Sequence, residues 1–205
     1  MMAEPAGSKT SESPLTDAEA RFRNVRFGLT IFLIVFGVLF AASMIGVVVI
    51  RLRAEQWSVP PLPRVLWLST LILLASSGTI HWALRSVKSG DERSLRRGMV
   101  LTTLLGVLFL ALQLWCWIYW FDITHEQWVD SKPWRLALSG FYLLTGLHAL
   151  HVVGGVIPLL ITTRRAFAGR YTFKDYGGIA LCAMYWHFLD AVWVVLFITL
   201  KLTVG

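Results

Sequence analysis

The chain has 205 residues, of which 56% are hydrophobic and only 15% are charged, and its formal net charge is +7. This composition argues against an ordinary soluble domain, although the length alone would suit one. The charges lie between long uncharged stretches, so the basic balance is better explained by membrane topology than by a nucleic-acid-binding surface.

Five apolar runs are each long enough to form a membrane-spanning helix, which needs about 20 residues. They cover residues 28–50, 63–85, 98–121, 135–162 and 177–202. Membrane-spanning β-strands would be half as long and would alternate in polarity, unlike these runs. We therefore expect an all-α membrane protein, with a five-transmembrane-helix bundle over residues 21–205. Residues 1–20 are polar, and we expect them to form a disordered cytoplasmic tail.

Lysine and arginine are unevenly divided between the two sides of this predicted bundle. The N-terminal tail and the second and fourth connections carry 13 of them, whereas the other side carries 6. Because basic residues collect on the cytoplasmic side, we expect the N-terminus in the cytoplasm and the C-terminus outside.

The second span ends in His81, Trp82 and Arg85, close to the predicted cytoplasmic interface. An interfacial aromatic residue beside a basic side chain that reaches toward water is common at this depth. The alternative is a site for the headgroup of an anionic lipid. The sequence Ser-Gly-Asp at 89–91 then predicts a turn, with glycine ending one helix and aspartate capping the next.

The fourth and fifth spans carry polar residues near the middle of the membrane. His148 and His151 share one helix face, and so do His187 and Asp190, because residues three apart lie on the same side. Asp190 is the only acidic residue within any of the runs, and a charge at this depth costs about 3 kcal/mol. At about 1.5 Å of rise per residue, all four fall at similar depths. We predict one buried polar cluster that joins the last two spans.

Three explanations of this cluster are open from the residues alone. It could be a hydrogen-bonded clasp between helices, with Asp190 neutral or paired with a histidine. It could bind haem, with His187 and either His148 or His151 as axial ligands. It could relay protons or ions through Asp190 in a transporter. The two cysteines, Cys116 and Cys182, are predicted at different depths, too far apart for a disulfide.

Several stretches resemble subunit III of the haem-copper terminal oxidases, the cytochrome c and quinol oxidases. Residues 185–197 resemble the family's Tyr-Trp-His-Phe-x-Asp-x-x-Trp run, which lies in its last helix. Residues 140–152 resemble its preceding Thr-Gly-Phe-His-Gly-Leu-His motif, and residues 73–83 and 101–113 also follow its pattern. The similarity covers nearly everything from residue 21 onward and corresponds to the short, five-helix form.

The resemblance implies a non-catalytic subunit of a respiratory oxidase, in the plasma membrane of a bacterium. Such a chain stabilises the catalytic subunit and its proton uptake during aerobic electron transport, and it has no catalytic centre of its own. Haem and copper would lie in the partners, the catalytic subunit I with subunit II. This chain would hold no metal but would bind phospholipid, and Arg165 falls where relatives place a basic residue near such a lipid.

Two positions depart from the family pattern. Gly37 and Cys116 stand where the family usually has membrane-embedded glutamates. A divergent subunit III fits these departures, and so does a subunit III-like accessory protein of a nitric oxide reductase. The residues alone also allow a bis-histidine haem membrane anchor or a proton-coupled transporter.

Overall fold

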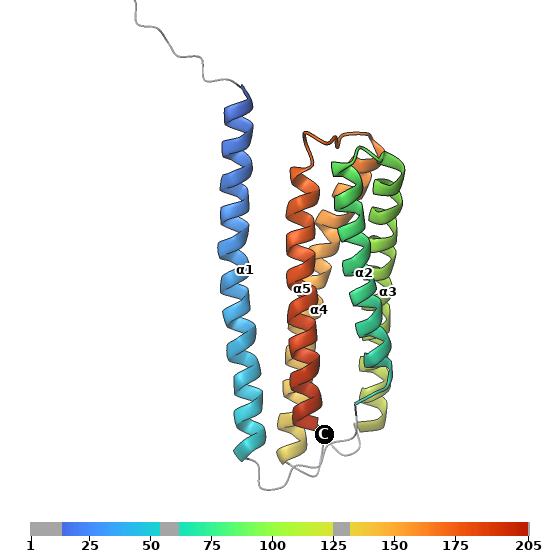
Figure 1. Ribbon diagram of the computed structural model, residues 1–205. Helices are drawn as coiled ribbons and strands as arrows, with labels where there is room; N and C mark the ends of the chain where they lie inside the picture. The colour runs from blue at the N-terminus through green and yellow to red at the C-terminus, as the bar shows by residue number, and fades with distance from the viewer. Residues whose placement is uncertain (1–13, 54–61, 125–131, 205) are drawn as a thin grey trace, which may run out of the picture.

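The computed structural model describes residues 14–53, 62–124 and 132–204, and within them the chain forms five α-helices and no strand (Figure 1). The helices are α1 (Pro14–Arg53), α2 (Val65–Lys88), α3 (Glu92–Thr124), α4 (Lys132–Phe167) and α5 (Gly177–Val204). Each contains a stretch that is long and apolar enough to cross a membrane. The predicted all-α architecture with five membrane-spanning helices is confirmed, and the chain is a multi-pass membrane protein.

Four of these helices form a ring and the fifth lies outside it. α2 packs against α3 and α5, and α4 packs against the same two helices from the opposite side. Within the described ranges, the backbone of α1 approaches only α5 and α4, and Figure 1 shows it standing beside the ring. α1 is therefore attached to the ring through the last two helices of the chain.

Small residues let the ring close tightly. A Cβ atom added to Gly98 of α3 would lie 2.9 Å from the Cβ of Ala83 in α2. A Cβ added to Gly106 would lie 2.7 Å from the indole of Trp186, which reaches across from α5. Close approach at small residues is how membrane helices gain van der Waals contact, since lipid already satisfies their apolar surfaces.

The predicted turn between the second and third spans is confirmed. Gly90 has a φ of 77°, a backbone conformation that glycine adopts without strain. Asp91 then caps α3, because its Oδ1 accepts a hydrogen bond of 3.1 Å from the backbone N–H of Ser94. Hydrogen bonding by the Ser94 side chain, followed by that of its backbone N–H, holds the pKa of the Asp91 carboxyl below its usual value.

The helices extend beyond the apolar runs. The sequence predicts disorder through residue 20, but α1 begins at Pro14, and only residues 1–13 of that tail lie outside the described residues. Proline at a helix start and the helix-favouring residues after it, such as Leu15, Ala18 and Glu19, explain this longer helix. The N-terminal end of α1, the α2–α3 turn and the α4–α5 loop lie at one end of the molecule (Figure 1).

Candidate functional site

Side-chain hydrogen bonds join residues 70–77 of α2 to residues 186–193 of α5. Within the described residues they run from Trp186 Nε1 to Ser76 Oγ (2.9 Å), between Ser77 Oγ and His187 Nδ1 (2.7 Å), and from Trp193 Nε1 to Thr70 Oγ1 (3.0 Å). We call these six residues the α2–α5 seam. Each pair matches a long side chain of α5 with a hydroxyl of α2, so the seam fixes how the two helices are rotated toward each other.

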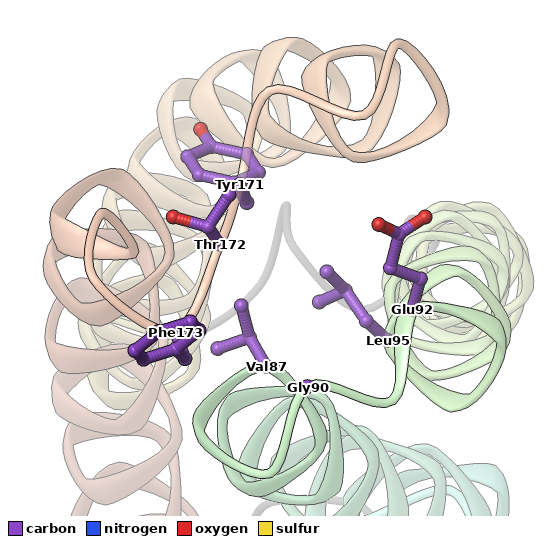
Figure 2. A pocket seen from close by; sticks show the side chains of 7 residues that line it. All are labelled: Val87, Gly90, Glu92, Leu95, Tyr171, Thr172 and Phe173. Atoms are coloured by element: carbon purple, nitrogen blue, oxygen red, sulfur yellow. The ribbon is translucent and has the colours of Figure 1, made fainter.

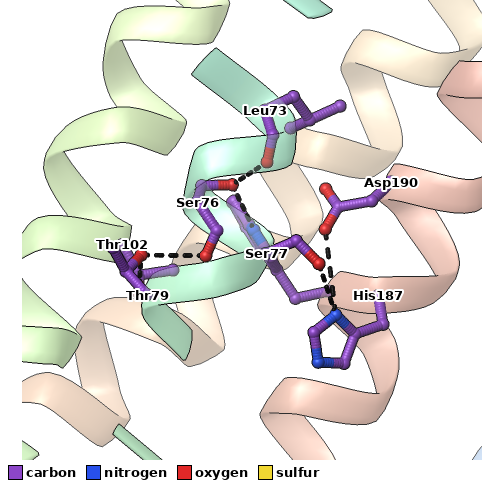
Figure 3. Close-up of polar contacts among 8 residues, drawn as sticks. Leu73, Ser76, Ser77, Thr79, Thr102, His187 and Asp190 are labelled. Atoms are coloured by element: carbon purple, nitrogen blue, oxygen red, sulfur yellow. Dashed lines mark hydrogen bonds and ion pairs between the residues drawn. The ribbon is translucent and has the colours of Figure 1, made fainter. Parts of the chain in front are cut away.

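The hydroxyls of α2 serve two purposes at once. Ser76 Oγ accepts from Trp186 and donates to the backbone carbonyl of Leu73 at 2.7 Å. One turn away, Thr79 Oγ1 lies 2.8 Å from Thr102 Oγ1 and carries the polar contacts to α3 (Figure 3). Such a hydroxyl group donates a hydrogen bond to a backbone carbonyl of its own helix and accepts one from a neighbouring helix. It therefore links two helices without placing a charge in the membrane.

Trp193 connects α5 to three other helices. Its indole N–H bonds Thr70 of α2, and its ring centroid lies 5.0 Å from that of Phe109 in α3 and 5.1 Å from that of His148 in α4. Trp193 is completely buried. The centre of the ring is therefore organised around one aromatic side chain that belongs to the motif of the last span.

Asp190 faces the interior of the protein and only 4% of it is exposed. Its Oδ2 lies 4.0 Å from His187 Nδ1, and both side chains approach Ser77 of α2 (Figure 3). Among the described residues, neither carboxyl oxygen has a hydrogen-bond partner. A buried carboxyl group without a hydrogen bond is costly, so this position marks a constraint that packing alone does not explain.

The histidines of α4 have different surroundings. His148 is completely buried, and the rings of Phe40, Phe109 and Trp193 surround it, with centroids 5.1 to 6.2 Å from its own. Neither of its ring nitrogens has a hydrogen-bond partner in the part of the chain that the structure describes. His151 turns toward α1, where its centroid lies 4.2 Å from that of Phe36. Its Nδ1 lies 2.6 Å from the carbonyl oxygen of Leu147.

The structure divides the four predicted cluster residues into two pairs. His187 and Asp190 face α2, whereas His148 and His151 face Trp193 and the aromatic side chains of α1. No hydrogen bond between described residues joins one pair to the other. Counting residues gives an approximate depth in the membrane but not the direction of a side chain around the helix axis, and His148 lies beside Trp193, six residues along α5 from His187. The partners of His187 were missed for this reason, although Ser76 and Ser77 lie at the matching depth.

These positions bear on the haem interpretation. His148 is enclosed by three rings, and His187 is held against α2, so the two imidazoles do not face a common space. Over the described residues, no three His, Cys, Asp or Glu side chains gather as a metal site. Cys116 and Cys182 are buried and free, as predicted.

The candidate lipid-binding residues lie on separate helices. His81, Trp82 and Arg85 lie near the end of α2, and the His81 ring centroid is 6.2 Å from that of His187. Arg165 is exposed at the end of α4, a helix that does not contact α2 within the described ranges. Arg165 acts on Tyr171, whose pKa is raised by burial while the guanidinium opposes that rise. These four residues therefore do not form one site.

A small cavity of about 160 Å³ lies at the same end of the bundle (Figure 2). Its lining comes from the α2–α3 turn, the start of α3 and the α4–α5 loop: Val87, Gly90, Glu92, Leu95, Tyr171, Thr172 and Phe173. The carboxylate in this lining, that of Glu92, is paired with Arg96 at 2.9 Å. The cavity offers no arrangement of groups for catalysis.

The two departures from the family pattern lie on different surfaces. At Gly37 of α1, an added Cβ would lie 3.7 Å from the ring of Phe188 in α5, so this position is part of the α1–α5 contact. Cys116 is buried in the ring, one turn after Gln113, whose amide has no partner among the described residues.

Comparison with known proteins gives a consistent result. The family described as "Cytochrome c oxidase subunit III" matches residues 18–203. A cytochrome c oxidase subunit 3 from Thermostichus vulcanus is 32% identical over 183 residues, which cover 83% of each chain. A probable cytochrome c oxidase subunit 3 from Mycobacterium leprae is 38% identical over 128 residues, covering 62% of this chain and 61% of the relative. The subunit 3 from Synechocystis is 29% identical over 181 residues, covering 86% and 74%.

Proposed function

Because this chain belongs to the cytochrome c oxidase subunit III family, we propose that it is the non-catalytic third subunit of a respiratory haem-copper oxidase. In this role it stabilises the catalytic subunit and supports proton uptake by that subunit during aerobic electron transport. Membership of the family places it in a complex with other oxidase subunits, and we propose that these are the catalytic subunit I and subunit II.

The observation that best supports a structural role is the use of the motif at residues 185–197. The indole N–H groups of Trp186 and Trp193 and Nδ1 of His187 are bonded to α2, and Trp193 also packs on α3 and α4. Groups committed to internal contacts are unsuited to bind a redox centre or a passing substrate. The motif therefore fits a scaffold better than a carrier of electrons or ions.

Haem and copper belong, in this proposal, to the partner subunits. A bis-histidine haem in this chain would need His187 and a histidine of α4 on opposite faces of the iron. His148 is surrounded by aromatic rings, and His151 packs against Phe36 and Phe40 of α1, so ligation by either histidine would require these contacts to open. The residues present do not fit that group, and we propose no redox step in this chain.

The proposed orientation places the N-terminus in the cytoplasm of a bacterium and the protein in its plasma membrane. The end of the bundle that carries the start of α1, the α2–α3 turn and the α4–α5 loop belongs to the side with 13 of the 19 lysines and arginines (Figure 1). This asymmetry supports a cytoplasmic position for that end. We further propose that phospholipid is bound at this end, with His81, Trp82, Arg85 and Arg165 as candidates for separate headgroup contacts.

The proposal is tested by isolating the tagged chain from its own membranes in a mild detergent. We expect it to co-purify with a larger haem-bearing chain, and we expect the isolated chain to be colourless. A Soret band in the isolated chain that disappears in His187→Ala would favour a haem anchor instead. Recovery of the chain without any haem-bearing partner would contradict the proposal.

Gly37 and Cys116 favour a second candidate, an accessory protein of a nitric oxide reductase, because they replace the glutamates that subunit III usually carries. The same purified complex distinguishes the two functions. Consumption of oxygen by the complex supports the oxidase, and consumption of nitric oxide without oxygen uptake supports the reductase. A flux of ions across liposomes that contain only this chain would indicate a transporter.

A further inference from the structure

A groove of about 490 Å³ lies on α3 near the α2–α3 turn, between the ends of α2 and α4. Its lining residues are Trp82, Arg93, Arg96, Arg97, Val100, Leu101 and Phe167. The five residues from α3 follow the spacing i, i+3, i+4, i+7 and i+8, which places them on one face of that helix. Three arginines therefore meet an apolar surface in a single groove.

The positive charge of this groove is only partly balanced. Arg96 is paired with Glu92, with 2.9 Å between Nη2 and Oε2. Arg93 and Arg97 form no ion pair with any residue that the structure describes. The nearby carboxylate of Asp91 caps α3 through the N–H of Ser94, and the charge of Arg97 is the weakest of the influences that lower the pKa of Asp91. Two guanidinium groups are thus available for an anion.

The surface next to the arginines is apolar. Leu101, Leu104 and Leu108 continue along α3 toward the middle of the membrane and are 43%, 60% and 45% exposed. Trp82 and Phe167, 40% and 55% exposed, flank the groove from α2 and α4. The Arg96 guanidinium lies 6.0 Å from the centroid of the Phe167 ring. The groove is cationic at the end of the bundle and apolar on the side toward the middle of the membrane.

We propose that this groove binds one anionic glycerophospholipid. The lipid phosphate contacts Arg93 and Arg97, whose planar guanidinium groups bind phosphate oxygens in pairs. One acyl chain lies along Leu101 and Leu104, with Trp82 at the level of the glycerol backbone. A lipid uses both halves of the groove, whereas a free phosphate would use only the arginines. The groove shares Trp82 with the headgroup contacts proposed above, whereas Arg85 and Arg165 do not line it. Binding here depends neither on the oxidase function nor on which side of the membrane is cytoplasmic.

Native mass spectrometry of the lipid-stripped full-length chain tests the proposal. Dioleoyl phosphatidylglycerol and dioleoyl phosphatidylcholine are titrated separately, so that the acyl chains are the same and only the headgroup differs. We expect tighter binding of phosphatidylglycerol. The Arg93→Gln/Arg97→Gln variant should bind it roughly 30-fold more weakly, since each basic residue contributes about a factor of five near an anionic lipid.

The matched control is Arg164→Gln/Arg170→Gln, which removes the same charge from exposed positions at the same end of the bundle. It should bind phosphatidylglycerol like the wild-type chain. Equal affinity of the wild-type chain for the two lipids would overturn the proposal, and this result needs no variant to fold. Equal losses in the two double variants would also overturn it, because they would indicate general surface charge. Displacement of phosphatidylglycerol by an equal concentration of inorganic phosphate would overturn it too, because the apolar half of the groove would then contribute nothing.

Discussion

The contact of α5 with α2 and the contact of α5 with α1 differ in chemistry. The first is the α2–α5 seam, in which side-chain hydrogen bonds of 2.7 to 3.0 Å connect α5 to hydroxyls of α2. The second is made of apolar surfaces such as Phe188 beside Gly37, with a weak polar contact from Thr199 Oγ1 to Met44 Sδ at 3.8 Å. Hydrogen bonds fix the rotation of a helix, whereas apolar contacts tolerate small shifts.

The burial of the two helices follows the same division. In its most apolar stretch, 50% of the residues of α5 are buried, compared with 22% for α1. α1 therefore leaves most of its surface for lipid or for another subunit, and α5 is the centre of the fold. Changes at the seam should damage the whole bundle, and equivalent changes on α1 should be tolerated when the chain is studied alone.

The largest effect is expected from Trp193→Ala. This change removes the ring between Thr70, Phe109 and His148 and leaves a cavity at the centre of the bundle, at a cost of about 3 kcal/mol. Thermal unfolding in detergent measures the loss. The control is Trp115→Ala, because Trp115 is 53% exposed on the outside of α3. Equal destabilisation by the two changes would remove the distinction between the core of the ring and its surface.

A somewhat smaller loss, about 2 kcal/mol, is expected from Gly106→Leu. The new side chain would occupy the space of the Trp186 indole, 2.7 Å from the site of its Cβ, and would push Trp186 away from Ser76. Gly46→Leu on α1 is the matched change, since nothing lies within 4 Å of a Cβ there. Normal stability of the Gly106 variant would show that Trp186 has room to move and that the seam is looser than described.

A smaller difference between the two contacts of α5 is expected in the coupling free energies that double-mutant cycles measure. Replacing Ser77 and His187 with alanine, singly and together, should give a coupling free energy of about 0.6 kcal/mol, a typical interhelical value in membranes. The same cycle with Met44 and Thr199 should give a coupling near zero. A larger coupling between Met44 and Thr199 than between Ser77 and His187 would reverse the comparison.

The smallest effect is expected outside the membrane, at the turn between α2 and α3. The pKa of Asp91 is lower in the folded chain than its ordinary value of 3.8, so its contribution to stability is present above that pH and is lost as the pH falls through the lowered pKa. Asp91→Asn should keep the cap on α3 and flatten this part of the acid dependence of unfolding. An unchanged acid profile in the variant would contradict the capping role of the carboxylate.

The sequence predicts the parts of this fold that depend on hydropathy and on local geometry. Five spans, the turn at Gly90 and Asp91, and two unbridged cysteines follow from run lengths, backbone preferences and helix rise. Each of these three features depends on the position of a residue along the chain, which can be counted from the sequence. The length of the apolar run does not predict the start of α1 at Pro14, because a helix can continue past its apolar part into polar surroundings.

The partners of the polar residues depend on rotation around the helix axis. His148 packs among aromatic rings beside Trp193, whereas His187 bonds Ser77 and lies six residues, or about 9 Å, from Trp193 along α5. Nothing local in the sequence distinguishes these outcomes, since both histidines lie in apolar runs. The sequence likewise indicates only a contribution of Arg93 and Arg97 to membrane topology, and the neighbouring helices of the fold form the groove that they line.

The most direct test of the seam is cross-linking in intact membranes. In a chain whose Cys116 and Cys182 are replaced by alanine, cysteines are introduced at positions 77 and 187 in one variant and at positions 148 and 187 in another. With a short bifunctional thiol reagent, we expect an intrachain cross-link in the first variant and none in the second. A cross-link between positions 148 and 187, with none between 77 and 187, would contradict the seam and restore a single cluster between α4 and α5.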